Sequence, residues 1–228
     1  MGEADKNYLA LKEHLTREGP FLSVAGNIEE IQRHFLLSPS PSIKALRYAI
    51  SIGYPLSAPV IEEIVDHPTI LYKHHYRQVN NLLDRVALSV HGFILNRGGA
   101  SLPIPTSVFL DRKTQAAHLS HKMVANHLGL GWIGQNILLI TSETGARIRL
   151  VTVLTDFPLE SPQRPGGSCG DCVSCARVCP AEAIGDKPED FNLEACSKIC
   201  QGFGKKYVGV SICGICVKAC SPGLGETG

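Results

Sequence analysis

Cysteine is the residue type with the clearest chemical meaning in this chain. All nine cysteines lie between residues 169 and 220 of a sequence of 228 residues. Thiolates bind soft metal ions and iron–sulfur clusters, whereas secreted disulfide scaffolds usually spread their cysteines through the whole fold. An odd number of thiols confined to the last quarter of the chain therefore indicates metal ligation rather than disulfide bonding.

The first four cysteines form a C-x2-C-x2-C-x3-C run that Pro180 closes: Cys169, Cys172, Cys175 and Cys179. This spacing resembles the bacterial ferredoxin motif for a [4Fe–4S] cluster. Two intervening residues let three thiolates converge on one cubane, while the fourth points toward the other cluster in two-cluster proteins. Gly170 suits the crowded loop because it has no Cβ. Zinc is the alternative, although zinc sites usually pair two C-x2-C units across a longer loop.

A second, shorter run repeats the first with one thiolate missing: Cys213-x2-Cys216-x3-Cys220. Either Cys196 or Cys200 can supply the missing ligand, because two cubanes take roughly eight thiolates and nine are present. We assign the first cluster to Cys169, Cys172, Cys175 and Cys220. We assign the second to Cys179, Cys196, Cys213 and Cys216, which leaves Cys200 spare.

Composition limits the other classes of function. The length suits one medium domain, or one domain with a small appendage, and the net charge is +1. No basic stripe stands out, which argues against nucleic acid as a partner. No apolar run approaches the ~20 residues of a membrane span, and the polar start does not resemble a signal peptide. We therefore expect a cytoplasmic protein with no membrane partner.

Residues 1–160 alternate between patterns typical of helices and of strands. Helices are expected at 7–19, 27–35, 59–66, 72–99 and 113–128, the fourth long, amphipathic and stopped by Gly98-Gly99. Strands or extended segments are expected at 21–25, 45–56, 101–105, 136–141 and 147–155, with the last two joined as a hairpin through 142–146. Residues 38–42 are expected to form a loop, and the Pro/Gly-rich stretch 158–168 a domain boundary. The pattern predicts an α+β chain with domains 1–160 and 161–228.

The string GLGWIG at 129–134 fits G-x-G-x-x-G literally. A dinucleotide site needs a strand, then the glycines, then a helix. Here a helix is expected before the glycines and a strand after them, so Gly129 is better interpreted as a helix C-cap. The glycines around Trp132 then indicate either tight helix–strand packing or a cofactor that lies against this loop.

The string LSHKMVANHLGLGWIGQNILLIT (119–141), followed by VTVLTDFPL (151–159) and the cysteine-rich tail, resembles the epoxyqueuosine reductase and reductive dehalogenase superfamily. The resemblance implies a nitroreductase-like α/β body that binds cobalamin, followed by a bacterial ferredoxin-like domain with two [4Fe–4S] clusters. Electrons would pass from a donor such as a ferredoxin or flavodoxin, through the clusters, to the corrinoid. A small-molecule substrate or a corrinoid protein would be the further partner.

The cofactor-binding residues implied by this resemblance are His121, Lys122, Gly129, Gly131, Trp132, Gly134 and Asn136. Lys122 is otherwise a solvated charge at a helix start. Epoxyqueuosine reductases also carry a proton-donating aspartate in a VDSAP-like stretch. The comparable region here reads SLPIPTSVFLDRK, in which Asp111 is the nearest acid, and Tyr54 is a second candidate donor.

The chain is short for an epoxyqueuosine reductase, and two classes of function therefore stay open. The first is a cobalamin-dependent reductase of a small substrate. The second is an electron-transfer or corrinoid-handling protein without a substrate of its own.

Overall fold

The computed structural model describes residues 2–37, 41–111, 116–162 and 166–220. The chain divides into two compact units, each built from three segments. The first unit comprises Met1–Tyr54, Asn80–Leu130 and Arg149–Pro165. The second comprises Pro55–Val79, Gly131–Ile148 and Gly166–Gly228, and it contains every cysteine.

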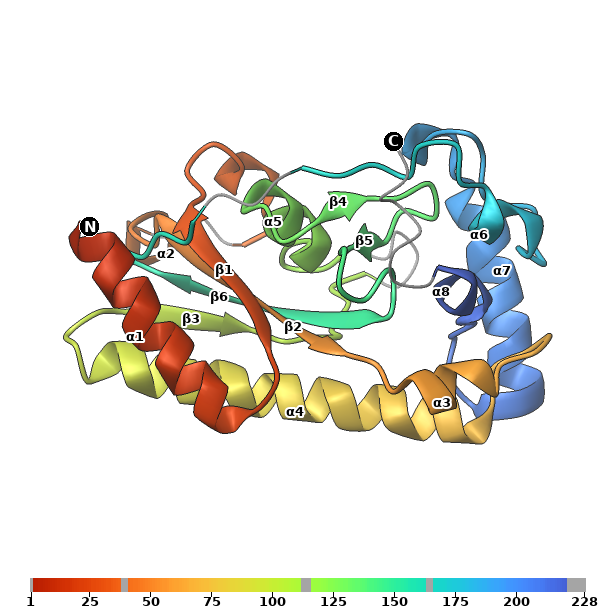
Figure 1. The fold of residues 1–228 in the computed structure, drawn as a ribbon, viewed down its shortest axis with the longest axis horizontal. Coiled ribbons are helices and arrows are strands. Elements are labelled where there is room, and N and C mark those ends of the chain that lie inside the picture. Colours follow the sequence, from red (N-terminus) through yellow and green to blue (C-terminus); the bar gives the residue numbers. More distant parts are fainter. Residues whose placement is uncertain (1, 38–40, 112–115, 163–165, 221–228) are drawn as a thin grey trace. The chain divides into compact units, whose positions relative to one another are not determined.

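A four-stranded sheet in the order β1-β2-β6-β3 forms the centre of the first unit (Figure 1). Its strands are β1 (Leu22–Asn27), β2 (Tyr48–Pro55), β3 (Ser101–Ile104) and β6 (Ile148–Thr155). β1 pairs antiparallel with β2, and β3 pairs antiparallel with β6. β3 is an edge strand, which is why it tolerates Pro103, a residue without an amide hydrogen.

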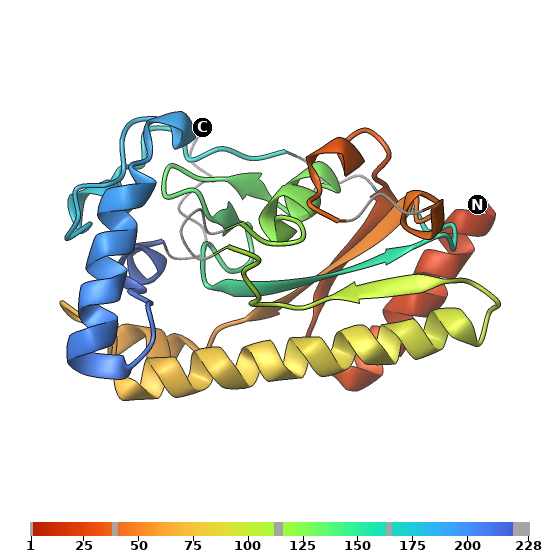
Figure 2. The ribbon, with the colours of Figure 1, turned by 180° about the vertical axis from the view of Figure 1, so that it is seen from behind.

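Helices α1 (Glu3–Glu18) and α4 (Ile70–Leu95) pack on each other in the first unit. Nε2 of His14 lies 2.9 Å from Oγ of Ser89, and its ring centroid lies 5.2 Å from that of Phe93. β3 runs alongside the C-terminal part of α4 (Figure 2), where Nδ1 of His91 lies 2.7 Å from Oγ of Ser101. α4 buries a stripe at helical spacing on this side: Leu83, Val86, Val90 and Ile94.

A second group of apolar side chains joins the sheet to helix α5 (His121–His127). Ala49 of β2, Ile104 of β3 and Leu154 of β6 form one buried cluster with Val124 of α5. Short elements complete this unit: the 3₁₀ turn η1 (Gln32–His34) and α2 (Pro41–Lys44).

The second unit is built from short elements around the cysteines. Two strands, β4 (Trp132–Ile133) and β5 (Leu139–Ile140), pair antiparallel. The helical elements are α3 (Ala58–Glu62), the start of α4, α6 (Ser174–Arg177), η2 (Pro188–Asp190), α7 (Leu193–Phe203), the π-helical turn η3 (Gly204–Val208) and α8 (Ile215–Ala219).

The α+β fold class predicted from the sequence is confirmed. The helices expected at 7–19, 59–66 and 72–99, and the strands expected at 21–25, 45–56 and 101–105, are all found within a few residues. None of the helices in the described part of the chain is both long and apolar enough to cross a membrane.

The helix expected at 27–35 is wrong, because only the 3₁₀ turn Gln32–His34 forms there. Asn27 ends β1 instead of capping a helix, although its side-chain oxygen does accept the amide of Glu29 at 2.8 Å. The amide of the fully buried Ile28 donates to the carbonyl of Arg47 at 2.9 Å. Tertiary contacts thus hold this segment as turns.

The helix expected at 113–128 is shorter than predicted. Residues 112–115 lie outside the described residues, and α5 begins only at His121, where the Ser120 hydroxyl caps the amide of Met123 at 3.3 Å. The expected loop at 38–42 overlaps the undescribed residues 38–40, and residue 41 begins α2.

The expected hairpin of 136–141 with 147–155 is wrong. β5 pairs with β4, which precedes it, whereas β6 pairs with β3. Residues 141–146 instead make a tight local turn in which Thr141 and Gly145 exchange backbone hydrogen bonds of 2.8 and 3.1 Å.

Candidate functional site

The first cysteine run folds as a tight turn followed by a short helix. The amide of Cys172 donates to the carbonyl of Cys169 at 3.0 Å, and Gly170 between them adopts φ +50°, which favours glycine. α6 carries Cys175, which is buried. The run ends at Cys179, whose sulfur accepts the amide of Ala183 at 3.4 Å.

The thiols of Cys169, Cys172, Cys175 and Cys220 form one set. Burial, together with the charges of Cys169, Cys175 and Cys172, raises the pKa of Cys220 to about 11. Burial also raises the pKa of Cys175, to which Cys169 and Cys172 add. Hydrogen bonds from the Ser174 hydroxyl and backbone lower the pKa of Cys172. The charges of Cys169 and Cys172 thus reach both Cys175 and Cys220.

The thiols of Cys179, Cys196, Cys213 and Cys216, the second assigned ligand set, lie together with Cys200, on which the charges of Cys213 and Cys216 also act. Burial, together with the charges of Cys196 and Cys179, raises the pKa of Cys213 to about 11. Burial also raises the pKa of Cys216, to which Cys213, Cys196 and Cys179 add. Cys175 of the first set acts on Cys216 as well, so the two sets are neighbours.

Cys196 and Cys200 lie four residues apart on α7, a spacing that puts both on one face of the helix. A hydrogen bond between the two thiols lowers the pKa of Cys196 to about 7 and raises that of Cys200. Among the described residues, no three His, Cys, Asp or Glu side chains are arranged to bind a single metal ion.

Polar anchors from distant segments fix the helix that carries Cys216. The Lys218 ammonium on α8 donates to the carbonyls of Ile64 at 2.7 Å and Glu62 at 2.8 Å. The Arg147 guanidinium donates to the carbonyl of Lys218 at 2.6 Å and pairs with the Glu62 carboxylate at 2.8 Å. The sequence analysis missed this anchor, because nothing in the sequence distinguishes these three charges from surface charges.

Gly131 and Gly134 of the GLGWIG string lie in the second unit and pack against β5. A Cβ on Gly131 would lie 2.0 Å from the carbonyl oxygen of Ile140, and one on Gly134 would lie 2.8 Å from the Ile140 side chain. Trp132 is covered by Gly167, where a Cβ would lie 2.2 Å from the indole ring. The absence of side chains at these positions therefore permits close packing around Trp132.

Three neighbouring side chains in this loop bury polar atoms that have no hydrogen-bond partner among the described residues: Nε1 of Trp132, Oε1 of Gln135 and Nδ2 of Asn136. Gln135 is 8% exposed and Asn136 3%. Ile137 adopts φ +54°, which is rare for a β-branched residue. An unsatisfied buried polar group costs about 1–3 kcal/mol, and backbone strain clusters at ligand sites. The loop is a candidate ligand site with two donors and one acceptor.

His121, in the first unit, has both ring nitrogens engaged. Its Nε2–H donates to the carbonyl of Pro105 at 3.0 Å, and its Nδ1 accepts the Thr152 hydroxyl at 2.9 Å. Burial lowers the pKa of His121 to about 4, so the ring is neutral at pH 7. Burial also lowers the pKa of Lys122. These contacts tie α5 to β6, and a role for either residue toward a cofactor stays a prediction.

Gly129 caps α5, as the sequence predicts. It adopts φ +80°, and its amide donates to the carbonyl of Asn126 at 3.0 Å, while the amide of Leu130 donates to that of Ala125 at 2.8 Å. α5 precedes Gly129 and β4 begins directly after Gly131, so the strand–glycines–helix order needed for a dinucleotide site is reversed.

The two candidate proton donors both belong to the first unit. Tyr54, near the end of β2, packs its ring against Phe21 with centroids 5.2 Å apart. Asp111 is exposed and bridges to Ala116. Catalytic roles for both stay predictions.

No family model matches the chain. Curated epoxyqueuosine reductases do match part of it: the protein of Listeria monocytogenes is 38% identical over 66 residues, and that of Escherichia coli is 36% identical over 69 residues. These stretches cover 29% and 30% of this chain, but only 17% and 18% of the two reductases.

Solved structures share the fold. A catabolic reductive dehalogenase matches 96% of this chain and 32% of its own, with a TM-score of 0.71 and 17% identity. The epoxyqueuosine reductase of Streptococcus thermophilus matches 93% of this chain and 65% of its own, with a TM-score of 0.59 and 19% identity. An epoxyqueuosine reductase solved with a modified tRNA stem loop matches 96% of this chain and 66% of its own, with a TM-score of 0.56 and 16% identity. The resemblance to the epoxyqueuosine reductase and reductive dehalogenase superfamily, and the fold that it implies, are confirmed.

Proposed function

We propose that the chain holds two [4Fe–4S] clusters and passes electrons through them to a corrinoid, as the redox core of an epoxyqueuosine-reductase-like reductase of a small substrate. The observation that carries this proposal is the gathering of the thiols into two neighbouring groups, one around Cys220 and one around Cys213 and Cys216. Each group contains the four ligands assigned from the ferredoxin-like spacing, and the partial sequence match to epoxyqueuosine reductases supports the same function.

The chemistry of the donor sets fits iron–sulfur clusters. Burial and mutual repulsion hold several of these thiols protonated, and bound iron would supply the positive charge that stabilises the thiolates. The Ala183 amide already donates to the sulfur of Cys179, and hydrogen bonds to cluster sulfurs tune reduction potentials. Residues 161–228 would then be the cluster domain and residues 1–160 the corrinoid domain, as the sequence predicts.

The loop at 132–136 fits a corrinoid through its buried polar atoms. The peripheral amides of a corrinoid offer acceptors for the N–H groups of Trp132 and Asn136 and a donor for the carbonyl oxygen of Gln135. When bound, a corrinoid supplies a reducible cobalt centre. The protein would contribute orientation, exclusion of water and a proton from Asp111 or Tyr54. A ferredoxin or flavodoxin would supply electrons.

The proposed substrate class also includes nucleic acid. Composition argues against a nucleic-acid partner, but one structural neighbour was solved with a tRNA stem loop. An RNA-borne base is therefore a second substrate to test beside free small molecules.

An electron-transfer or corrinoid-handling protein without its own substrate is the alternative function. The sequence match covers 17% and 18% of the length of the two reductases, so their activity is a proposal for this chain. The two proposals share the clusters and the corrinoid and differ only in whether this chain acts on a substrate.

A cobalamin titration tests the corrinoid site. Anaerobically reconstituted protein is expected to shift the cobalamin absorption spectrum to a base-off form at micromolar concentrations. Asn136→Asp keeps the oxygen that accepts the amide of Leu138 at 3.1 Å but removes the buried donor. We expect about tenfold weaker binding, since one hydrogen bond is worth about 1.4 kcal/mol here.

The matched control is Asn96→Asp, the same change at an exposed position, which should bind as wild type does. Iron content should be unchanged in both variants. No spectral change with wild-type protein would contradict the corrinoid proposal, and wild-type affinity in Asn136→Asp would contradict this loop as the site.

A further inference from the structure

Cys200 is the one thiol that the two assigned ligand sets leave out. Helix α7 has a half-buried stripe at helical spacing, formed by Cys196, Ile199, Cys200 and Phe203. Its other sides are exposed, as at Glu194, Lys198 and Gln201. Cys200 therefore points to the same side of the helix as the assigned ligand Cys196, one turn further along.

The chain after α7 turns back against the end of the helix. The amide of Gly204 donates to the carbonyl of Cys200, and the amide of Gly209 donates to the carbonyl of Gly204 at 2.8 Å. A Cβ on Gly204 would lie 2.9 Å from the carbonyl oxygen of Val210, so the missing side chain lets the returning segment lie against α7. This segment leads directly to Cys213. The charge of the Cys213 thiol acts on Cys200, which is consistent with this return.

The Cys196 and Cys200 thiols are hydrogen-bonded to each other. A thiol that binds no metal is mostly protonated at pH 7, because its usual pKa is about 8.5. A thiolate that ligates iron carries no proton and can only accept. With Cys196 as the ligand, Cys200 is therefore the donor of this hydrogen bond.

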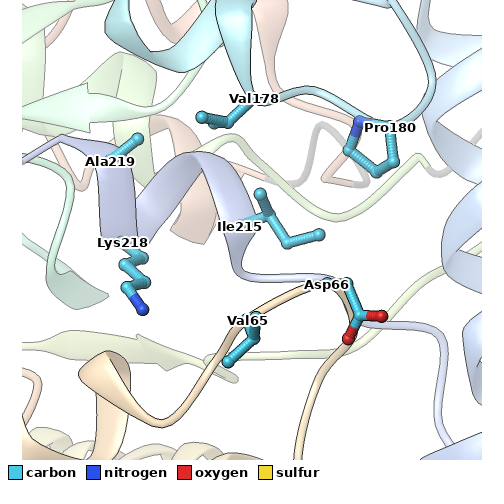
Figure 3. A pocket seen from close by; sticks show the side chains of 7 residues that line it. All are labelled: Val65, Asp66, Val178, Pro180, Ile215, Lys218 and Ala219. Carbon is cyan, nitrogen blue, oxygen red and sulfur yellow. The ribbon is translucent and has the colours of Figure 1, made fainter.

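An apolar pocket lies beside other ligands of the second set. Its volume is about 370 Å³, and it is lined by Val65, Asp66, Val178, Pro180, Ile215, Lys218 and Ala219. Ile215 directly precedes Cys216, Val178 directly precedes Cys179, and Figure 3 shows Ile215 between Val178 and Val65. The Lys218 ammonium already donates to two carbonyls, and the carboxylate of the lining only accepts. This lining therefore offers the second set no uncommitted side-chain donor.

We propose that the Cys200 thiol donates a hydrogen bond to the sulfur of Cys196 when Cys196 ligates the second cluster, and that it thereby raises the reduction potential of this cluster. The inference rests on the proposed function, which places a cluster there. Reduction adds negative charge to a cluster, and hydrogen bonds to its sulfurs favour the more negative form. Cys200 is thus a positioning residue that acts through Cys196, and not a ligand.

A redox titration of the anaerobically reconstituted full chain, followed by electron paramagnetic resonance of the reduced clusters, tests the proposal. Cys200→Ala should keep about eight iron atoms and lower one of the two midpoint potentials. At a fixed potential, the ratio of reduced to oxidised second cluster should fall about tenfold, which is about 59 mV for a one-electron couple. The other midpoint potential should not move.

Two matched variants separate the thiol proton from other effects of the substitution. Cys200→Ser keeps an O–H donor and should recover most of the lost potential. Gln201→Ala truncates the exposed neighbour on the same helix and should leave both potentials as in wild type. The double variant Cys196→Ser/Cys200→Ala should keep only the first cluster, with the potential that this cluster has in Cys196→Ser.

Wild-type potentials in a Cys200→Ala protein with full iron content would overturn the proposal. Equal potentials in Cys200→Ala and Cys200→Ser would overturn it as well, because the donated proton would then have no effect. Loss of about four iron atoms from Cys200→Ala would show that Cys200 is a ligand instead. A wild-type chain that binds no iron would refute the proposed function, and this inference with it.

Discussion

Replacing Cys196 with serine is expected to remove about four iron atoms per chain, one whole cluster. Cys196 acts on both Cys213 and Cys216, so its loss takes one ligand from the second set. The first set has its own four thiols and should keep its cluster. Iron and acid-labile sulfide analysis after anaerobic reconstitution measures the loss.

The chain supplies a matched control one helical turn away. Cys200→Ser changes the same residue type on the same helix and should leave about eight iron atoms in place, because the second set is complete without it. The opposite result, with iron lost only from Cys200→Ser, would exchange the roles of the two thiols. Full iron content in both variants would contradict the assignment of this helix to the second cluster.

Gly131→Ala is expected to destabilise the protein by about 3 kcal/mol or more. The added Cβ would lie 2.0 Å from the backbone oxygen of Ile140, which no side-chain rotation can relieve. The β4–β5 pair must then move apart, and Trp132 lies directly beside this contact in the chain. Thermal unfolding should show a midpoint lower by roughly 6–12 °C.

Gly92→Ala is the control for this prediction. Gly92 lies inside α4, where an added Cβ meets no atom within 4 Å. Alanine there should stabilise the helix by about 0.5–1 kcal/mol. A Gly131→Ala protein as stable as wild type would show that β4 and β5 do not pack as described, and would restore a ligand-facing role for this glycine.

The cysteine sets could be proposed from the sequence because ferredoxin-like spacing reflects the geometry of the cluster itself, and their assignment stays a prediction. α4 could be predicted for a similar reason, because its buried stripe from Leu83 to Ile94 repeats at helical spacing. The helix predicted at 27–35 was wrong because contacts with a distant segment, rather than the local sequence, decide the structure there. The sequence there is typical of a capped helix, but the amide of Ile28 donates to the carbonyl of Arg47, nineteen residues later in the chain.

The rest of the site depends on contacts between distant segments. β6 finds its partner in β3, more than forty residues earlier, so adjacency in the sequence favoured the wrong hairpin. The anchor of α8 joins Glu62, Arg147 and Lys218 from three segments. The buried polar atoms of Gln135 and Asn136 that lack a hydrogen-bond partner among the described residues could likewise not be predicted, because their burial depends on the surrounding fold.

The central claim is that the thiols hold two cubanes, and the iron and sulfide content of the wild-type chain tests it most directly. After anaerobic reconstitution we expect about eight iron and eight sulfide per chain, with a broad absorption shoulder near 400 nm that dithionite bleaches. About four iron and four sulfide would leave one of the two sets without a cluster. Stoichiometric zinc without sulfide would contradict the account altogether.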